Sequence, residues 1–213
     1  KKICISGDRV VIEPGVSCQK CHYCLQGRFN LCRKFAFIGT GNRPGALSRY
    51  LAHPMNNCHK IPQHIALADG AICTGLASAI HACKRAGLHK ETNVAIIGTG
   101  FTGINLVLTC KIMGIKNIFV IESSEYRMNL ARHFGAEYVL KIKPHGDPQY
   151  LKQIIKEIIG QGPDVTFETA GNTESFEIAT VITRGGGQIV VINPKPKIIR
   201  AKLDRMANRE IDI

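Results

Sequence analysis

The sequence has no tryptophan, and aromatic residues make up only 6% of its 213 positions. It also lacks an apolar run of the ~18 residues that a membrane-spanning helix needs, so no membrane partner is expected. No secretory signal is recognisable. The chain begins with Lys1 and ends at Ile213, in what reads as the start of a strand. We therefore expect both ends to be cut and the sequence to be an internal fragment.

Acidic residues are also scarce, with 16 Asp and Glu against 28 Lys and Arg, for a net charge of +12. Such an excess is typical of nucleic-acid-binding proteins, in which it is clustered. Here the basic residues are dispersed, and no long block of like charge and no RNA-binding aromatic motif is present. A basic enzyme with an anionic cofactor explains the charge better. We expect no nucleic-acid partner, and a nucleic-acid binder built on a zinc module stays as a weaker alternative.

Cysteine, in contrast, is abundant and unevenly placed. Four of the nine cysteines lie within fifteen residues, at Cys18, Cys21, Cys24 and Cys32. Four thiolates at this spacing predict a zinc lobe over about 16–34, and four protein ligands leave no open position, so the zinc is expected to be structural. An iron–sulfur cluster is the main alternative, although its usual spacings differ. Without a secretory signal, clustered thiols indicate a reducing compartment, here the cytoplasm.

The segment 94–103 (VAIIGTGFTG) is a short apolar run followed by a glycine pattern and then by helical periodicity. Gly98 allows a tight turn out of the strand, and Gly100 allows the backbone to approach a pyrophosphate at the positive end of the following helix. Gly103 allows the helix to pack closely on the strand. With Phe101 and Thr102, which lie between these glycines, the turn predicts a dinucleotide site.

An acidic residue at the end of the next apolar run strengthens this prediction. Glu122 follows Gly103 by 19 residues and can accept hydrogen bonds from both adenosine ribose hydroxyls. Its carboxylate would repel a 2′-phosphate, so NAD is favoured over NADP. Ser123 and Ser124 would tolerate a phosphate, but no arginine is adjacent to them in the sequence. Arg127 could reach the adenosine side, or it could simply be a solvent-exposed helix residue.

Strands and helices alternate beyond residue 91, which predicts an α/β fold: a Rossmann-type doubly wound parallel sheet. The expected strands are 93–97, 117–121, 138–140, 165–168 and 187–192, and the expected helices are 102–113, 125–134, 148–159 and 173–182. Because cofactors lie across the carboxyl ends of such strands, the candidate contacts include Thr169, Ala170, Gly171 and Ile192. Upstream the pattern is β-rich, with strands expected at 9–13, 47–53 and 58–61. One or two helices are expected over 66–86.

The motifs, taken together and in this order, resemble the zinc-containing medium-chain dehydrogenases, with the strongest likeness to their sorbitol (polyol) branch. The similar segments are the cysteine set and 7–15 (GDRVVIEPG), 27–32 (GRFNLC), 80–83 (IHAC), 183–186 (TRGG) and 209–213 (REIDI). The resemblance implies part of a GroES-like domain over 1–88 and an NAD-binding Rossmann domain over 89–213 whose sixth strand is truncated. It implies hydride transfer from a polyol or secondary alcohol to NAD, and a homo-oligomeric parent protein.

Three departures from the family pattern bear on activity. The family's ligands of a catalytic zinc lie upstream of the matching segment, so no catalytic residue is assigned and the second zinc is expected only in the full-length parent. Thr74-Gly75 stands where polyol members usually carry Glu-Pro, and 193–196 (NPKP) replaces a glycine-rich loop. The alternative function is therefore a catalytically dead, dinucleotide-binding relative that keeps only the structural zinc. This chain alone is expected to be inactive.

Overall fold

The computed structural model describes residues 4–142, 146–192 and 198–213. The chain divides into two compact units, Lys1–Thr74 and Gly75–Ile213. The loop 193–196 lies outside the described residues. Among the described helices, none is long and apolar enough to cross a bilayer.

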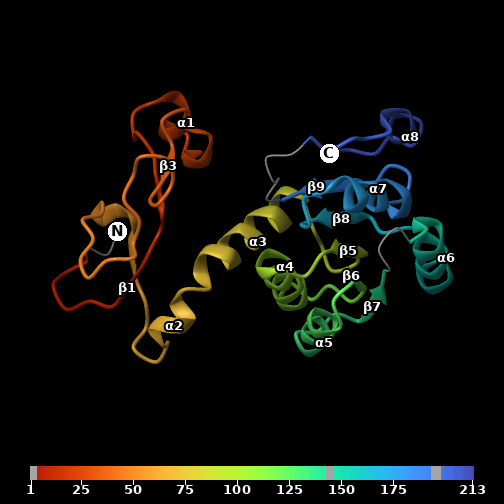
Figure 1. Cartoon of the computed structure of the whole chain (residues 1–213), viewed down its shortest axis with the longest axis horizontal. Helices are drawn as coiled ribbons and strands as arrows, with labels where there is room; N and C mark the ends of the chain where they lie inside the picture. Colours follow the sequence, from red (N-terminus) through yellow and green to blue (C-terminus); the bar gives the residue numbers. More distant parts are fainter. Residues whose placement is uncertain (1–3, 143–145, 193–197) are drawn as a thin grey trace. The chain divides into compact units, whose positions relative to one another are not determined.

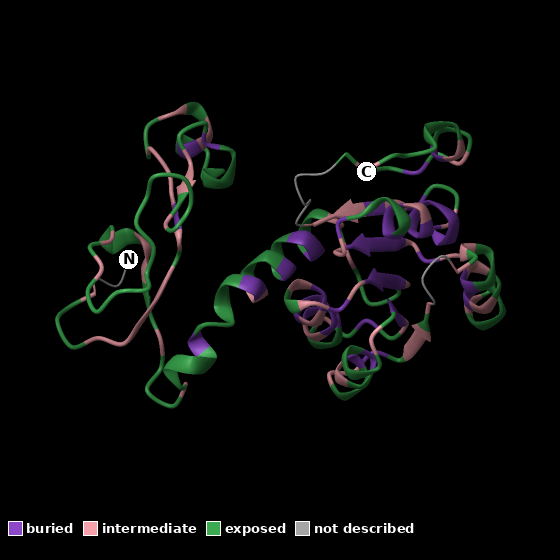
Figure 2. Cartoon of the chain, in the orientation of Figure 1, coloured by how far each residue is buried: buried purple, intermediate pink, exposed green. Residues whose placement is uncertain are grey.

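The first unit contains short elements only. Strand β1 (Val10–Ile12) pairs antiparallel with β4 (Cys58–Lys60), and β2 (Gly15–Val16) pairs antiparallel with β3 (Ala36–Phe37). The remaining turns are α1 (His22–Leu25), α2 (Leu67–Gly70) and the 3-10 helices η1 (Phe29–Leu31) and η2 (Met55–Asn57). Within its described residues, Cys24 and Cys32 are the only buried side chains (Figure 2). This unit therefore has no apolar core of its own.

The strand expected at 47–53 is wrong, because the structure forms no ladder there. The backbone N–H of Ser48 donates to the carbonyl of Ala46, and its hydroxyl donates to the carbonyl of Tyr50 at 2.8 Å. Such local bonds compete with a strand ladder. Leu47 and Tyr50 are almost fully exposed. An apolar residue pattern produces a strand only where a neighbouring strand can accept its hydrogen bonds.

The second unit contains a five-stranded parallel sheet in the order β7-β6-β5-β8-β9, which confirms the expected doubly wound fold (Figure 1). The strands are β5 (Val94–Ile97), β6 (Ile118–Glu122), β7 (Tyr138–Lys141), β8 (Val165–Glu168) and β9 (Gln188–Val191). The chain order reverses between β5 and β8, and such a switch point is where open α/β sheets bind ligands. Beyond β9, Asp212 forms one parallel bridge with Gln188.

Helices cover both faces of this sheet (Figure 1). They are α3 (Cys73–Arg85), α4 (Phe101–Ile112), α5 (Glu125–His133), α6 (Pro148–Ile159), α7 (Thr173–Ile182) and α8 (Leu203–Ala207). Alternate residues of β5 enter two separate apolar clusters. Val94 and Ile96 pack with residues of α3, α4 and α5, whereas Ala95 and Ile97 pack with residues of α6 and α7. The central strand is buried on both sides, and an unbroken apolar sequence is typical of such a strand.

Helix α4 approaches the turn after β5 so closely that one position tolerates no side chain. A Cβ atom on Gly103 would lie 2.1 Å from the carbonyl oxygen of Gly98 and 3.2 Å from Oγ1 of Thr169. Gly98 itself has a φ of +85°, a region that disfavours other residues. The glycines at both ends of the motif are thus required by the fold alone.

We expect Gly103→Ala to destabilise the protein by about 3 kcal/mol, the upper part of the range for overpacking, because the clash is with backbone that cannot rotate away. Urea unfolding followed by circular dichroism measures the change. Gly100→Ala is the matched control, since a Cβ there meets nothing within 4 Å. Equal stability of the two variants would contradict the close approach.

Candidate functional site

The glycine turn lies at the carboxyl edge of the sheet, at its switch point. The Gly98 N–H donates to the carbonyl of Ile121 at 2.9 Å, and its α-carbon faces Ala170. On the other side, the hydroxyl of Thr169 donates to the carbonyl of Gly98 at 2.7 Å. The turn is therefore held between the loops that follow β6 and β8, which is where both loops were expected to lie.

Gly100 differs from its two neighbouring glycines because the protein itself does not need it. Its φ of −64° is accessible to any residue, and a Cβ there would lie more than 4 Å from every atom of the described residues that could clash with it. It is the N-cap of α4, so the positive end of the helix dipole begins beside it. Phe101 is 60% exposed and Thr102 half-buried. The N-terminus of α4, with the positive end of its dipole, suits the pyrophosphate of a dinucleotide.

Glu122 ends β6 with its side chain buried and its carboxylate bonded within the chain. Oε2 accepts from the N–H of Thr99 at 2.8 Å and from its hydroxyl at 2.9 Å. Oε1 accepts from the N–H groups of Ser123 and Ser124 at 2.8 and 3.0 Å. Burial by itself would raise the pKa of Glu122, but the backbone donors outweigh it and hold the pKa below its ordinary value.

The guanidinium of Arg127 lies close to the Glu122 carboxylate. Its Nη1 lies 4.0 Å from Oε2 of Glu122, and about half of its side chain is exposed. The guanidinium is thus a cation beside the expected ribose position. Of the two alternatives that the sequence left open for Arg127, the short distance to Glu122 favours a place at the adenosine side, although the side chain is also partly exposed.

A second strand-end carboxylate was not identified as a site residue from the sequence. Glu168 ends β8, is fully buried, and accepts through Oε1 from the N–H groups of Ala170 and Gly171 at 2.9 and 2.8 Å. Its Oε2 has no partner among the described residues. The signal in the sequence was an acid closing an otherwise apolar strand, as Glu122 does. Glu168 shapes the loop that carries Thr169.

Ile192 lies at the same edge, because its N–H donates to the carbonyl of Glu168 at 2.9 Å. The structure thus brings together the glycine turn, the end of β6, the loop after β8 and the end of β9. It also gives Gly75 a packing reason. A Cβ there would lie 2.3 Å from the ring of Phe101, so the ring occupies the space over this glycine.

The four cysteines of the first unit form one cluster, with all four sulfur atoms within 4.8 Å of one another. The Sγ of Cys24 lies 3.9 Å from that of Cys18 and 3.5 Å from that of Cys21. A tetrahedral Zn²⁺ with thiolate bonds of about 2.3 Å separates its sulfurs by about 3.8 Å, so this donor set fits the metal. The backbone N–H of Lys20, against the cost of burial, lowers the pKa of Cys18 to about 6. The cluster has no position left for a substrate.

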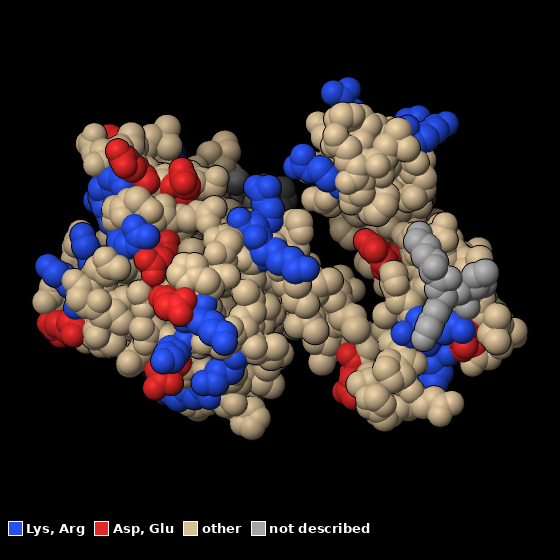
Figure 3. Space-filling view, turned by 180° about the vertical axis from the view of Figure 1, so that it is seen from behind, with Lys and Arg blue, Asp and Glu red and all other residues tan. Residues whose placement is uncertain are grey.

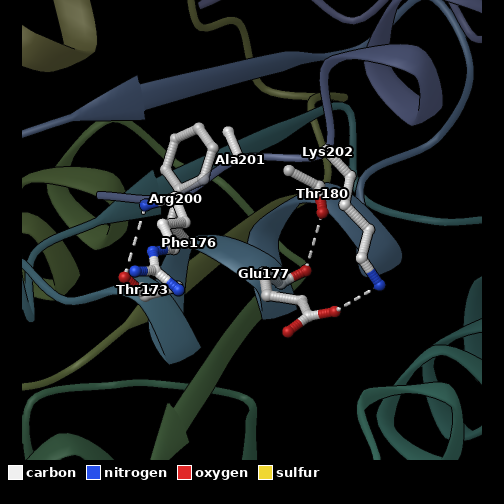
Figure 4. Close-up of a pocket in the computed structure, with 7 residues that line it drawn as sticks. All are labelled: Thr173, Phe176, Glu177, Thr180, Arg200, Ala201 and Lys202. Atoms are coloured by element: carbon white, nitrogen blue, oxygen red, sulfur yellow. Dashed lines mark hydrogen bonds and ion pairs between the residues drawn. The ribbon is translucent and has the colours of Figure 1, made fainter. Parts of the chain in front are cut away.

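A shallow hollow elsewhere on the second unit does not belong to this edge. It measures about 140 Å³ and lies between α7 and residues 200–202 (Figure 4). Lys202 pairs with Glu177 at 3.4 Å along its rim. None of its lining residues comes from the glycine turn or from the loops after β6 and β8. On the face drawn in Figure 3, Lys and Arg alternate with Asp and Glu over the second unit.

Comparison with known proteins now decides the family. Residues 102–213 match the family described as zinc-binding dehydrogenase, and residues 4–63 match the alcohol dehydrogenase GroES-like domain. The chain belongs to the zinc-binding dehydrogenase family. This confirms the resemblance seen in the motifs. Membership of one family accounts for both the four-cysteine lobe and the parallel sheet.

Within this family, the chain is 33% identical to sorbitol dehydrogenase of Arabidopsis thaliana and 34% identical to L-idonate 5-dehydrogenase of Vitis vinifera, each over 98% of its length. It spans 58% and 57% of these two relatives. Among solved structures, an Escherichia coli oxidoreductase of unknown specificity superposes with a TM-score of 0.88 at 31% identity, over 97% of this chain and 58% of that one. The chain is thus a polyol-dehydrogenase-like member of the family.

We expect the zinc content of the purified protein to depend on the cluster. Cys24→Ser should remove most of the bound zinc and unfold the first unit, because a lost thiolate leaves three ligands and no apolar core to replace the metal. Elemental analysis with limited proteolysis measures both effects. Cys73→Ser is the control, since Cys73 is exposed and lies outside the cluster. Full zinc occupancy in the Cys24 variant would contradict the assignment.

Proposed function

We propose that the whole protein is an NAD-dependent dehydrogenase of a polyol or secondary alcohol, with a structural zinc in the four-cysteine lobe. The observation that supports NAD binding most directly is Gly100. Neither its backbone conformation nor its packing requires glycine, so the missing side chain is best explained by a ligand that lies there.

In this proposal, each part of the dinucleotide would contact a different segment of the second unit. The turn Gly98–Gly103 and the start of α4 would hold the pyrophosphate, and Glu122 would accept a ribose hydroxyl. Residues 169–171 and Ile192 would lie along the nicotinamide half, since they follow β8 and β9 beyond the switch point. Bound there, NAD would accept the hydride released by the alcohol. The protein's part is to orient the cofactor and to exclude its phosphorylated form.

The substrate class rests on the relatives and is coarser than the cofactor. The two curated relatives bear the names sorbitol dehydrogenase and L-idonate 5-dehydrogenase, both of which denote polyhydroxylated substrates. Among the described residues, the one group of three or more potential metal ligands is the cysteine cluster, and a structural zinc would use all four of its members. We propose that the ligands of a catalytic zinc come from outside these described residues. We also propose a homo-oligomer for the whole protein, by resemblance.

A catalytically dead relative that binds the dinucleotide is the second candidate. Thr74-Gly75 favours it, because the glutamate that polyol members usually carry there is missing. Two measurements on the full-length protein separate the candidates. Two zinc ions per chain and turnover of polyols with NAD support the dehydrogenase. One zinc, NADH binding and no turnover across a broad alcohol panel support the dead relative.

Gly100→Ala should weaken NADH binding more than about tenfold while leaving the melting temperature unchanged, because the new methyl group occupies only the ligand's space. Fluorescence titration of NADH measures the affinity. Gly45→Ala, in the first unit, serves as a distant control for glycine replacement. Unchanged NADH affinity in the Gly100 variant would count against the whole proposal.

Protonation of Glu122 gives a prediction on pH. Its folded pKa lies below the ordinary value of about 4.3, so its stabilising bonds are fully present above that pH and are lost as the pH falls through the folded pKa. We expect Glu122→Gln to be less stable than wild type at pH 7 by about 1–2 kcal/mol. The difference should shrink below pH ~4. Urea unfolding at several pH values tests this, and a difference independent of pH would contradict it.

A further inference from the structure

Thr99 occupies the variable position between Gly98 and Gly100, where the glycine motif itself requires no specific side chain. In the structure it is almost fully buried, and it is the residue that donates to Oε2 of Glu122 through both its N–H and its hydroxyl. The contact joins the turn after β5 to the end of β6, over a separation of 23 residues.

The two oxygens of Glu122 are held in different ways. Oε1 accepts from the backbone N–H groups of Ser123 and Ser124 at 2.8 and 3.0 Å, and from the Ser123 hydroxyl at a longer 3.3 Å, so its two shorter bonds do not depend on a side chain. Within the described part of the chain, the hydrogen bonds to Oε2 come from Thr99. Of the donors to Oε2, only the Thr99 hydroxyl belongs to a side chain, and it can be removed without changing the backbone.

Arg127 makes the exact position of Oε2 matter. Its guanidinium lies 4.0 Å from that oxygen and is about half exposed. With the Glu122 carboxylate in this position, its negative charge would repel a 2′-phosphate, although Arg127 lies beside it. If the carboxylate rotated away, the arginine would present a free cation to the same phosphate, and arginine binds phosphate well.

We propose that Thr99 is a positioning residue for cofactor choice: its hydroxyl fixes Oε2 of Glu122 at the adenosine ribose, which favours a free 2′-hydroxyl over a 2′-phosphate. The inference rests on the proposed dinucleotide site and adds to it the residue that sets selectivity. Thr99 acts through Glu122 and does not itself touch the reacting atoms.

The test compares Thr99→Val, which has nearly the same shape and lacks the hydroxyl, with Thr99→Ser, which keeps it. NADH and NADPH affinities are measured by fluorescence titration in the intact protein. We expect Thr99→Val to lower the preference for NADH over NADPH about tenfold, the effect of losing one hydrogen bond to a charged group. Thr99→Ser should restore the wild-type preference.

Thr109→Val is the matched control, because it also removes a buried hydroxyl from the same region, one that bonds the carbonyl of Asn105 and not Glu122. An NADH analogue without the adenosine 2′-hydroxyl separates positioning from general damage. Wild type should discriminate against the analogue, and Thr99→Val should discriminate less. A purely structural role would weaken both ligands equally.

The outcomes are distinct. If wild type binds neither NADH nor NADPH, the proposed dinucleotide site fails, and this inference fails with it. If wild type binds NADH and Thr99→Val keeps the full preference, only the role of Thr99 is overturned. Should Thr99→Val fail to fold, Thr99→Ala gives the same comparison without a branched side chain, and an unchanged preference there would overturn the role equally.

Discussion

The structure depends first on the contact between Gly103 and the carbonyl of Gly98, because it sets where α4 begins relative to β5. The same carbonyl accepts from Thr169, and the N–H of Gly98 donates to β6. One turn thus connects three neighbouring strands at their carboxyl ends. Since a Cβ at Gly103 would prevent this approach, a packing constraint places the start of the helix where a phosphate can use it.

Two buried carboxylates flank that turn, and they differ in the donors to their second oxygens. Glu122 and Glu168 each end a strand and each bind the N–H groups of the loop that follows. The second oxygen of Glu122 is also taken up by Thr99, whereas that of Glu168 has no partner in the described part of the chain. The two carboxylates thus order the loops after β6 and β8 in the same way and differ in the donors to their second oxygens.

Much of this could be predicted from the sequence, because the signals were local. The glycine motif, the cysteine spacing and the alternating apolar segments each depend on residues close together in the chain. The rest depends on partners that spacing does not reveal. Segment 47–53 is not a strand because no strand lies beside it, Thr99 meets Glu122 only after the sheet forms, and Gly75 is explained by the ring of Phe101.

The two units are stabilised by different kinds of interaction, and these bear differently on function. The second unit is held by apolar clusters on both faces of its sheet, and it would keep its edge without a metal. The first has Cys24 and Cys32 as its only buried side chains among the described residues, and a metal held by the cysteine cluster would supply cross-links where apolar packing is sparse. A metal in that role has no open position and cannot activate an alcohol. The four cysteines are therefore typical of the family, whereas the chemistry of an alcohol would need the strand ends of the second unit and a metal with an open coordination position.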